Sequence, residues 1–122
     1  MRVLVVDDSN HILAMVREML PDEGYTTLDA LNGQEAVDLL KSGEKVDVVL
    51  LDWNMPVMDG PTFLEAVRDE KLTDAPILMM TTENKIEKIT KAISLGASEY
   101  IMKPFTEDIL VSKIDFALKQ AA

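Results

Sequence analysis

The segment Val46-Asp47-Val48-Val49-Leu50-Leu51-Asp52 is almost continuous in Val and Leu and ends in a carboxylate. A short run of such aliphatic residues predicts a strand over 46–51 that is buried on both faces, as in a parallel sheet covered by helices. A charged side chain directly after a buried strand is unfavourable unless it has a partner. The segment therefore indicates the class of fold and, at Asp52, a position for a functional site.

The pattern around this strand repeats, because apolar runs of strand length alternate five times with segments of helical period. The first helical segment carries Ile12, Met15, Val16 and Met19 at i, i+3, i+4 and i+7, and Gly24 is expected to end it. In chain order we expect strands over 3–6, 25–30, 46–51, 77–80 and 100–102, and helices over about 10–23, from 33 to about 41, after 60, over about 84–95, and after 106. In the fourth helix, Ile86, Ile89 and Ile93 are expected on the inner side.

Alternation of strands and helices predicts an α/β fold with one open, parallel sheet and helices on both faces. The connections between parallel strands are right-handed, and the flavodoxin-like order 2-1-3-4-5 is the common arrangement for five strands. With 122 residues, the chain is long enough for one domain, which we place at 1–122.

In this order strands one and three are neighbours, so residues at their carboxyl ends meet at the topological switch point. Asp7 and Asp8 follow the first strand, and Asp52 follows the third. Thr81 and Lys103 end strands four and five, and they are expected along one side of the same crevice.

Three clustered carboxylates repel one another unless a cation lies between them. A site made only of oxygen ligands suits Mg²⁺, with Mn²⁺ as a substitute, better than zinc. A backbone carbonyl after Asp52, which we assign to Asn54, can complete the ligand set.

A central carboxylate can also act as a nucleophile and become an aspartyl phosphate. We assign this role to Asp52, with Lys103 as a point charge for the phosphoryl oxygens and Thr81 as a hydroxyl donor. Neither of these two is needed merely to hold a cation, so the set favours phosphoryl transfer over passive metal binding.

Composition excludes several classes of function. The formal net charge is −10, from 22 acidic and 12 basic residues, which opposes binding to nucleic acid. There are no cysteines, so disulfides, thiolate metal sites and thiol nucleophiles are excluded. No apolar run is long enough to span a bilayer, and we expect a cytoplasmic protein without membrane insertion.

Several motifs occur together in order. They are Val-Val-Asp-Asp-Ser at 5–9, Leu-Leu-Asp-Trp-Asn-Met-Pro at 50–56, Met-Asp-Gly at 58–60, Met-Thr-Thr at 80–82 and Gly-Ala-Ser-Glu-Tyr-Ile-Met-Lys-Pro-Phe at 96–105. With these motifs, essentially the whole chain resembles a receiver domain of bacterial two-component response regulators. Within that family it is most similar to the single-domain chemotaxis regulators of the CheY type.

The resemblance implies that Asp52 accepts a phosphoryl group from the phosphohistidine of a sensor histidine kinase. It implies that Asp8, Asp52 and the Asn54 carbonyl ligate Mg²⁺ directly, with Asp7 acting through water. It also implies a switch, in which Thr81 moves toward the phosphoryl group and Tyr100 turns inward.

The resemblance further implies a cis bond between Lys103 and Pro104. One position departs from the family, which usually carries Ala or Gly where this chain has Thr82. The larger side chain is expected to slow exchange of phosphodonor or water at the phosphoryl pocket.

Lys85, Lys88 and Lys91 form a basic stripe on the fourth helix. With Tyr100, this stripe is expected to form a surface for an acidic partner segment, because receivers use this face for output. The alternative, which the pattern alone favours, is a solvated helix face in which Glu87 and Lys91 form an i, i+4 pair.

The predicted protein is a monomeric, stoichiometric phosphoacceptor and not a turnover enzyme, with a flagellar motor switch protein as output target and a phosphatase as a further partner. Asn54 and Glu83, two residues beyond Asp52 and Thr81, favour motor control. The alternatives within signalling are a phosphate sink and a phosphorelay intermediate.

Two alternatives outside signalling are disfavoured. A Mg²⁺-dependent phosphohydrolase of the haloacid dehalogenase type needs Asp-x-Asp after the first strand, where this chain has Asp7-Asp8. A flavodoxin-like electron carrier needs a phosphate-cradling loop there, and no such loop follows the first strand.

Overall fold

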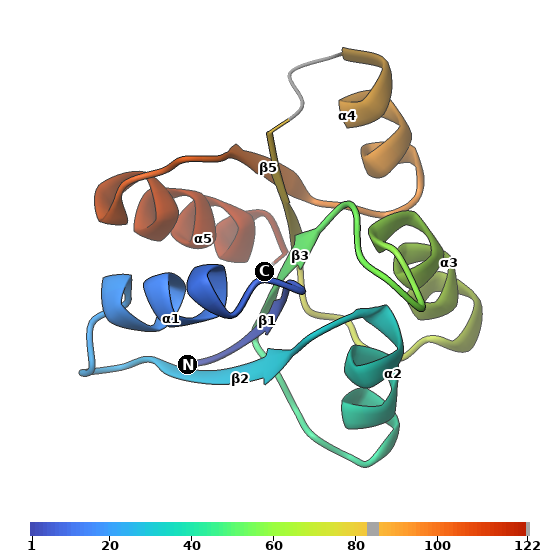
Figure 1. Cartoon of the computed structure of the whole chain (residues 1–122), viewed down its shortest axis with the longest axis horizontal. Coiled ribbons are helices and arrows are strands. Elements are labelled where there is room, and N and C mark those ends of the chain that lie inside the picture. The colour runs from blue at the N-terminus through green and yellow to red at the C-terminus, as the bar shows by residue number, and fades with distance from the viewer. Residues whose placement is uncertain (83–85, 122) are drawn as a thin grey trace.

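The computed structural model describes residues 1–82 and 86–121 of the chain. Five strands alternate with five helices in these residues (Figure 1). The elements are β1 (Arg2–Val6), α1 (Asn10–Met19), β2 (Thr26–Ala30), α2 (Gly33–Lys41), β3 (Val48–Asp52), α3 (Gly60–Glu70), β4 (Ile77–Thr81), α4 (Ile86–Ser94), β5 (Glu99–Met102) and α5 (Glu107–Ala121).

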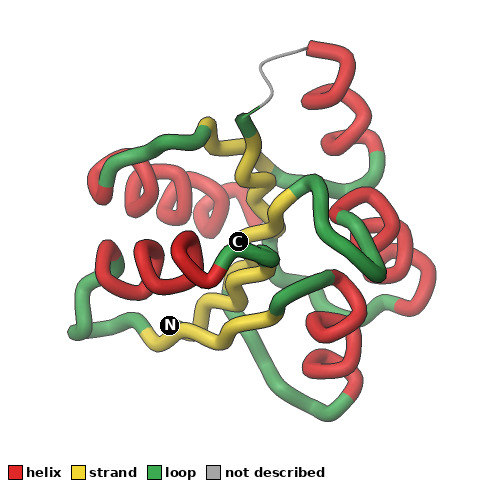
Figure 2. The backbone as a smooth tube through the Cα atoms, viewed as in Figure 1, coloured by secondary structure: helices red, strands yellow, loops and turns green. Residues whose placement is uncertain are grey.

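The five strands form one parallel sheet with the order β2-β1-β3-β4-β5, which confirms the predicted topology. Helices α1 and α5 cover one face of the sheet, and α2, α3 and α4 cover the other (Figures 1 and 2). The central strand β3 therefore lies between two helical layers, as its apolar composition predicts.

Alternate residues of each central strand supply the two cores. Val48 and Leu50 of β3 face α1 and α5, whereas Val49 and Leu51 face α2 and α3. Phe63 of α3 is fully buried in the second core. Because the side-chain period of a strand is two, a strand buried on both faces must be apolar at successive positions.

The helix boundaries follow local capping groups. Ser9 is the N-cap of α1, and its hydroxyl oxygen accepts a hydrogen bond from the Ile12 N–H at 3.3 Å. The expected end of this helix near residue 23 was wrong, because α1 ends at Met19 and Leu20 is already extended before Pro21. A residue before proline is disfavoured in the helical conformation, which outweighs the stop signal at Gly24.

The expected inner side of α4 was wrong for Ile86 and Ile93. Ile86 and Ile93 are 79% and 52% exposed, and the buried residue of this helix is Ala92. Ile89, the third residue of the predicted inner side, lines a small cavity beneath the helix together with Lys88 and Ala92. Seven residues are nearly two full turns, so Ile86 and Ile93 share a stripe that the orientation of α4 turns away from the sheet.

Candidate functional site

The predicted acidic cluster lies at the carboxyl edge of the sheet. The register pairs Val6 of β1 with Leu51 of β3, so Asp7 and Asp52 leave neighbouring strands at the same level. Oxygen atoms of Asp7, Asp8 and Asp52 all lie within 4.8 Å of one another. Parallel neighbouring strands thus place in one cluster carboxylates that are 44 or 45 positions apart in the chain.

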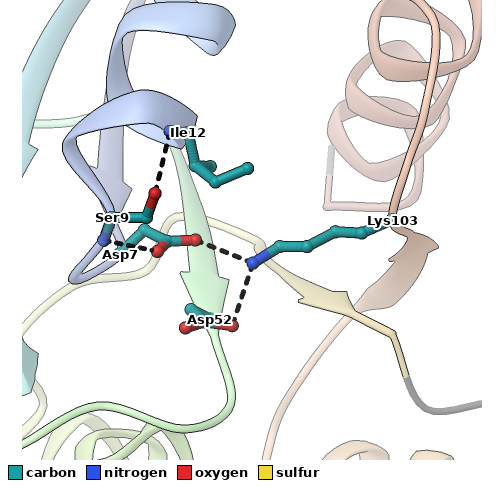
Figure 3. Close-up of polar contacts among 5 residues, drawn as sticks. All are labelled: Asp7, Ser9, Ile12, Asp52 and Lys103. Atoms are coloured by element: carbon teal, nitrogen blue, oxygen red, sulfur yellow. Dashed lines mark hydrogen bonds and ion pairs between the residues drawn. The ribbon is translucent and has the colours of Figure 1, made fainter.

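Asp7 is the most enclosed member of the cluster, with 1% of its surface exposed. Its Oδ1 accepts a hydrogen bond from the Ser9 N–H at 2.9 Å, and its Oδ2 lies 2.8 Å from the Lys103 ammonium (Figure 3). Asp8 is exposed. The buried carboxylate therefore has both a neutral and a charged partner, as a buried charge requires.

The Lys103 ammonium bridges two carboxylates. It lies 3.1 Å from Asp52 Oδ1 as well as 2.8 Å from Asp7 Oδ2, and its side chain is 15% exposed (Figure 3). Sequence analysis assigned Lys103 to the phosphoryl oxygens and did not predict this pairing with the carboxylates. The long side chain reaches across from β5, two strands from β3 in the sheet.

The pKa of Asp52 is raised above its ordinary value of 3.8, chiefly by burial and next by the charge of Asp7. The charge and hydrogen bond of Lys103 and the Trp53 backbone N–H act in the opposite direction but do not cancel these effects. For Lys103, burial lowers the pKa, yet the hydrogen bond to Asp7 and the charges of Asp52 and Asp7 raise it overall. The ionised form of Asp52 is therefore disfavoured, first by burial and next by Asp7, and the lysine beside it is firmly protonated.

Thr81 lies at the end of β4 and is 6% exposed. The Lys103 backbone N–H donates to the Thr81 carbonyl at 2.8 Å, which extends the pairing of β4 and β5 by one residue. The Lys103–Pro104 bond is cis, as the resemblance implied. Thr82 is exposed just beyond the strand, and its effect on exchange stays a prediction.

The loop from Trp53 to Asp59 is held at both ends by two glycines to which sequence analysis assigned no role at the site. The Gly60 N–H donates to the Trp53 carbonyl, and the Gly33 N–H donates to the Met58 carbonyl, both at 2.9 Å. A Cβ at Gly60 would lie 2.6 Å from the Asp52 carbonyl oxygen. Asn54, the predicted carbonyl ligand, is exposed within this loop.

We expect Gly60→Ala to displace the end of β3, because the new methyl group meets backbone atoms that cannot move aside. The free energy of unfolding should fall by about 1–3 kcal/mol, as in other overpacked sites, and divalent cations should bind more weakly. Chemical denaturation and cation titration measure the two effects. Thr62→Ala, an exposed position in the first turn of the same helix, is the control; equal behaviour of the two variants would contradict this account.

The oxygen cluster fits a hard divalent cation. Its ligands are carboxylates only, and two of them, Asp8 and Asp52, are accessible to solvent, whereas zinc sites generally use His and Cys. Among the described residues, Lys103 is the cation in contact with the cluster, and it offsets part of the negative charge of Asp7 and Asp52.

The predicted switch and partner residues lie next to this edge. Trp53 and Tyr100 line the small cavity under α4 together with Thr81. The Lys88 ammonium lies 5.8 Å from the centre of the Trp53 ring, and Lys91 is exposed on α4. Lys85 and Glu83 lie outside the described residues.

Comparison with known proteins decides the family. The model of the response regulator receiver domain matches residues 3–115. The chain belongs to this family. The chemotaxis protein CheY of Pseudomonas aeruginosa is 41% identical over 117 residues, which cover 94% of each chain. CheY-3 of Vibrio cholerae is 42% identical over 117 residues, covering 94% of this chain and 89% of the relative.

Solved structures of receivers have the same fold. The chemotaxis protein CheY4 of Vibrio cholerae aligns with a TM-score of 0.87 at 38% identity, covering 95% of this chain and 97% of the other. The receiver domain of the Francisella response regulator 1452 aligns with a TM-score of 0.88 at 27% identity, covering 99% and 98%. The chain is thus a receiver domain of CheY type, a class of signalling proteins in two-component systems and chemotaxis. Among its described helices, none is both long and apolar enough to cross a membrane.

Proposed function

We propose that this receiver, a single domain over residues 1–122, is a phosphoacceptor that takes a phosphoryl group on Asp52 from a sensor histidine kinase. The observation that carries the proposal is the position of Asp52. It lies at the carboxyl edge of the sheet, where the Lys103 ammonium bridges it to the buried Asp7. A purely structural ion pair would need neither the second carboxylate nor the neighbouring Asp8.

In the proposed reaction, a carboxylate oxygen of Asp52 forms a bond to phosphorus while the bond from phosphorus to the imidazole nitrogen of the kinase breaks. The imidazole leaves and takes up a proton. Lys103, whose raised pKa keeps it charged, neutralises charge on the phosphoryl oxygens, and Thr81 donates a hydrogen bond to one of them. Such transfers are accelerated mainly by positioning and electrostatics, which this site supplies.

Asp8, Asp52 and the Asn54 carbonyl would hold Mg²⁺, or Mn²⁺ in its place, with Asp7 acting through water. When bound, the cation supplies positive charge that offsets the three carboxylates and the incoming phosphoryl group. Asp7 orients Lys103 through the 2.8 Å contact and is itself fixed by the Ser9 N–H.

Saturating Mg²⁺ should stabilise the fold and change the fluorescence of Trp53, the single tryptophan, which adjoins Asp52. At a Mg²⁺ concentration of ten times the dissociation constant, linkage predicts a gain of about 1.4 kcal/mol in unfolding free energy.

A small acyl phosphate should then cause a second, Mg²⁺-dependent fluorescence change that is absent in Asp52→Asn. Saturation by the acyl phosphate without Mg²⁺ would contradict the proposal, and turnover of unrelated phosphate esters would instead favour a phosphohydrolase.

We propose that the phosphorylated, monomeric receiver acts in a cytoplasmic chemotaxis pathway on a flagellar motor switch protein and is reset by a phosphatase. The similarity to CheY proteins supports motor control over a phosphate sink or a relay intermediate. Lys85, Lys88, Lys91 and Tyr100 would contact the target.

Charge reversal of Lys88 and Lys91 together should weaken target binding about tenfold, because an acidic partner would then meet repulsion. Titration of a fluorescent target segment measures the affinity. Reversal of Lys41 and Lys45, exposed on another part of the surface, is the control; equal affinities would reject this surface.

A further inference from the structure

Tyr100 lies between a cation on one side and an apolar cavity on the other. The Lys113 ammonium of α5 lies 4.8 Å from the centre of the Tyr100 ring, within the range of a cation–π contact. The ring also lines the cavity that Thr81, Trp53 and Ile89 share. The cavity holds about 10 Å³, close to the space that one water needs. A phenol ring can therefore enter it only if the residues that line it rearrange.

Glu99 positions the cation on the ring. Its Oε1 accepts a hydrogen bond from the Tyr100 N–H at 2.9 Å and lies 3.4 Å from the Lys113 ammonium. The side chains of Lys113 and Glu99 are 32% and 19% exposed, so this pair is less screened than one at the open surface. The three residues thus form a closed set of contacts between β5 and α5.

We propose that Lys113 and Glu99 form a latch that holds the Tyr100 ring against α5 and sets the resting state of this receiver. Movement of the ring toward Thr81 breaks its contact with the ammonium, so the latch opposes that movement. This inference rests on the proposed switch role of Tyr100 and adds two positioning residues to it. Among the described residues, neither forms a hydrogen bond or an ion pair with Asp52, Asp7 or Asp8.

Removing the charge should shift the ring. Cation–π contacts at partly exposed sites have a strength that corresponds to about a two- to fivefold change in an equilibrium. Lys113→Met keeps much of the length of the side chain but loses the ammonium, whereas Lys113→Arg keeps a cation over the ring. We expect the ratio of displaced to latched ring to rise about two- to fivefold in Lys113→Met and to stay close to wild type in Lys113→Arg.

Incorporation of 3-fluorotyrosine tests this directly, because the chain has two tyrosines, Tyr25 and Tyr100. The ¹⁹F resonances are assigned with Tyr25→Phe, and the exchange of the Tyr100 ring is measured by relaxation dispersion without Mg²⁺ or phosphodonor. A larger displaced population of the Tyr100 ring in Lys113→Met, with an unchanged Tyr25 resonance, supports the latch, and a smaller one contradicts it. An unchanged population in both Lys113→Met and Glu99→Gln overturns it.

The two proposals can fail separately. If the ring shifts but no phosphoryl group is found on Asp52, the latch stands and the proposed function falls. If Asp52 is phosphorylated but the population of the displaced Tyr100 ring is the same in Lys113→Met and Glu99→Gln as in the wild type, the proposed function stands and the latch falls.

Discussion

Asp52→Asn is expected to abolish phosphorylation of the receiver. Asparagine has nearly the shape of aspartate but lacks the anionic oxygen that forms the bond to phosphorus. Mass spectrometry after incubation with an acyl phosphate and Mg²⁺ should show the added phosphoryl group in the wild type and none in the variant. Asp59→Asn, which changes the exposed N-cap of α3, is the matched control and should be labelled like the wild type. Stoichiometric labelling that persists in Asp52→Asn would place the acceptor elsewhere.

The same variant should be more stable than the wild type when no divalent cation is present. The pKa of Asp52 is raised by burial and by Asp7, so the folded protein binds a proton at Asp52 more tightly than the unfolded chain does. Ionised Asp52 therefore reduces stability at neutral pH, and the neutral amide removes this penalty. We expect an increase in Tm of roughly 2–5 °C for the variant.

The pH dependence follows from the direction of this shift. The advantage of the variant should be full above the raised pKa of folded Asp52, and it should vanish once the pH is below the ordinary value of 3.8. Thermal unfolding of the two proteins across this range measures the difference. A variant that is less stable at neutral pH would show that the contact with Lys103 outweighs the repulsion.

Lys103→Met should produce the largest loss of stability among these single changes. It removes the ammonium that lies 2.8 Å from Asp7 and 3.1 Å from Asp52, and leaves Asp7 with 1% exposure beside two other carboxylates. Breaking a buried pair by removal of one partner costs about 3 kcal/mol or more. The free energy of unfolding should fall by about 3 kcal/mol without Mg²⁺, and saturating Mg²⁺ should restore part of it.

The control is Lys41→Met, which removes a lysine 2.9 Å from Glu70 at a site where both side chains are about half exposed. Exposed pairs contribute less than about 1 kcal/mol, so this variant should stay near wild type. The double variant Asp7→Asn/Lys103→Met should recover most of the lost stability. Equal losses in Lys41→Met and Lys103→Met would show that Asp7 does not depend on its cation.

Phosphorylation should also slow in Lys103→Met, by about 100-fold, which is typical for loss of one group that stabilises developing charge. In the wild type, the pKa of Lys103 is raised above its ordinary value of 10.5. The stability that Lys103 contributes is therefore complete below pH 10.5 and is lost only as the pH rises through the raised value. The lysine stays charged throughout the physiological range.

The amino-acid sequence alone determined the strands, their order and the edge at which the site forms. These features depend on patterns that repeat over a few residues: continuous apolar runs for β1, β3 and β4, and polar residues directly after them. Once the order is β2-β1-β3-β4-β5, Asp7, Asp8 and Asp52 must meet, because parallel neighbours end at the same edge.

Tertiary structure alone decided how these groups contact one another. Lys103 and Asp7 are 96 positions apart, and their pairing depends on the reach of one long side chain across the sheet. The outward turn of Ile86 and Ile93 and the contact of Lys113 with Tyr100 depend in the same way on how a helix is seated against its neighbours. Periodicity shows that a helix has an apolar stripe, but packing against a particular surface selects which part of that stripe is buried.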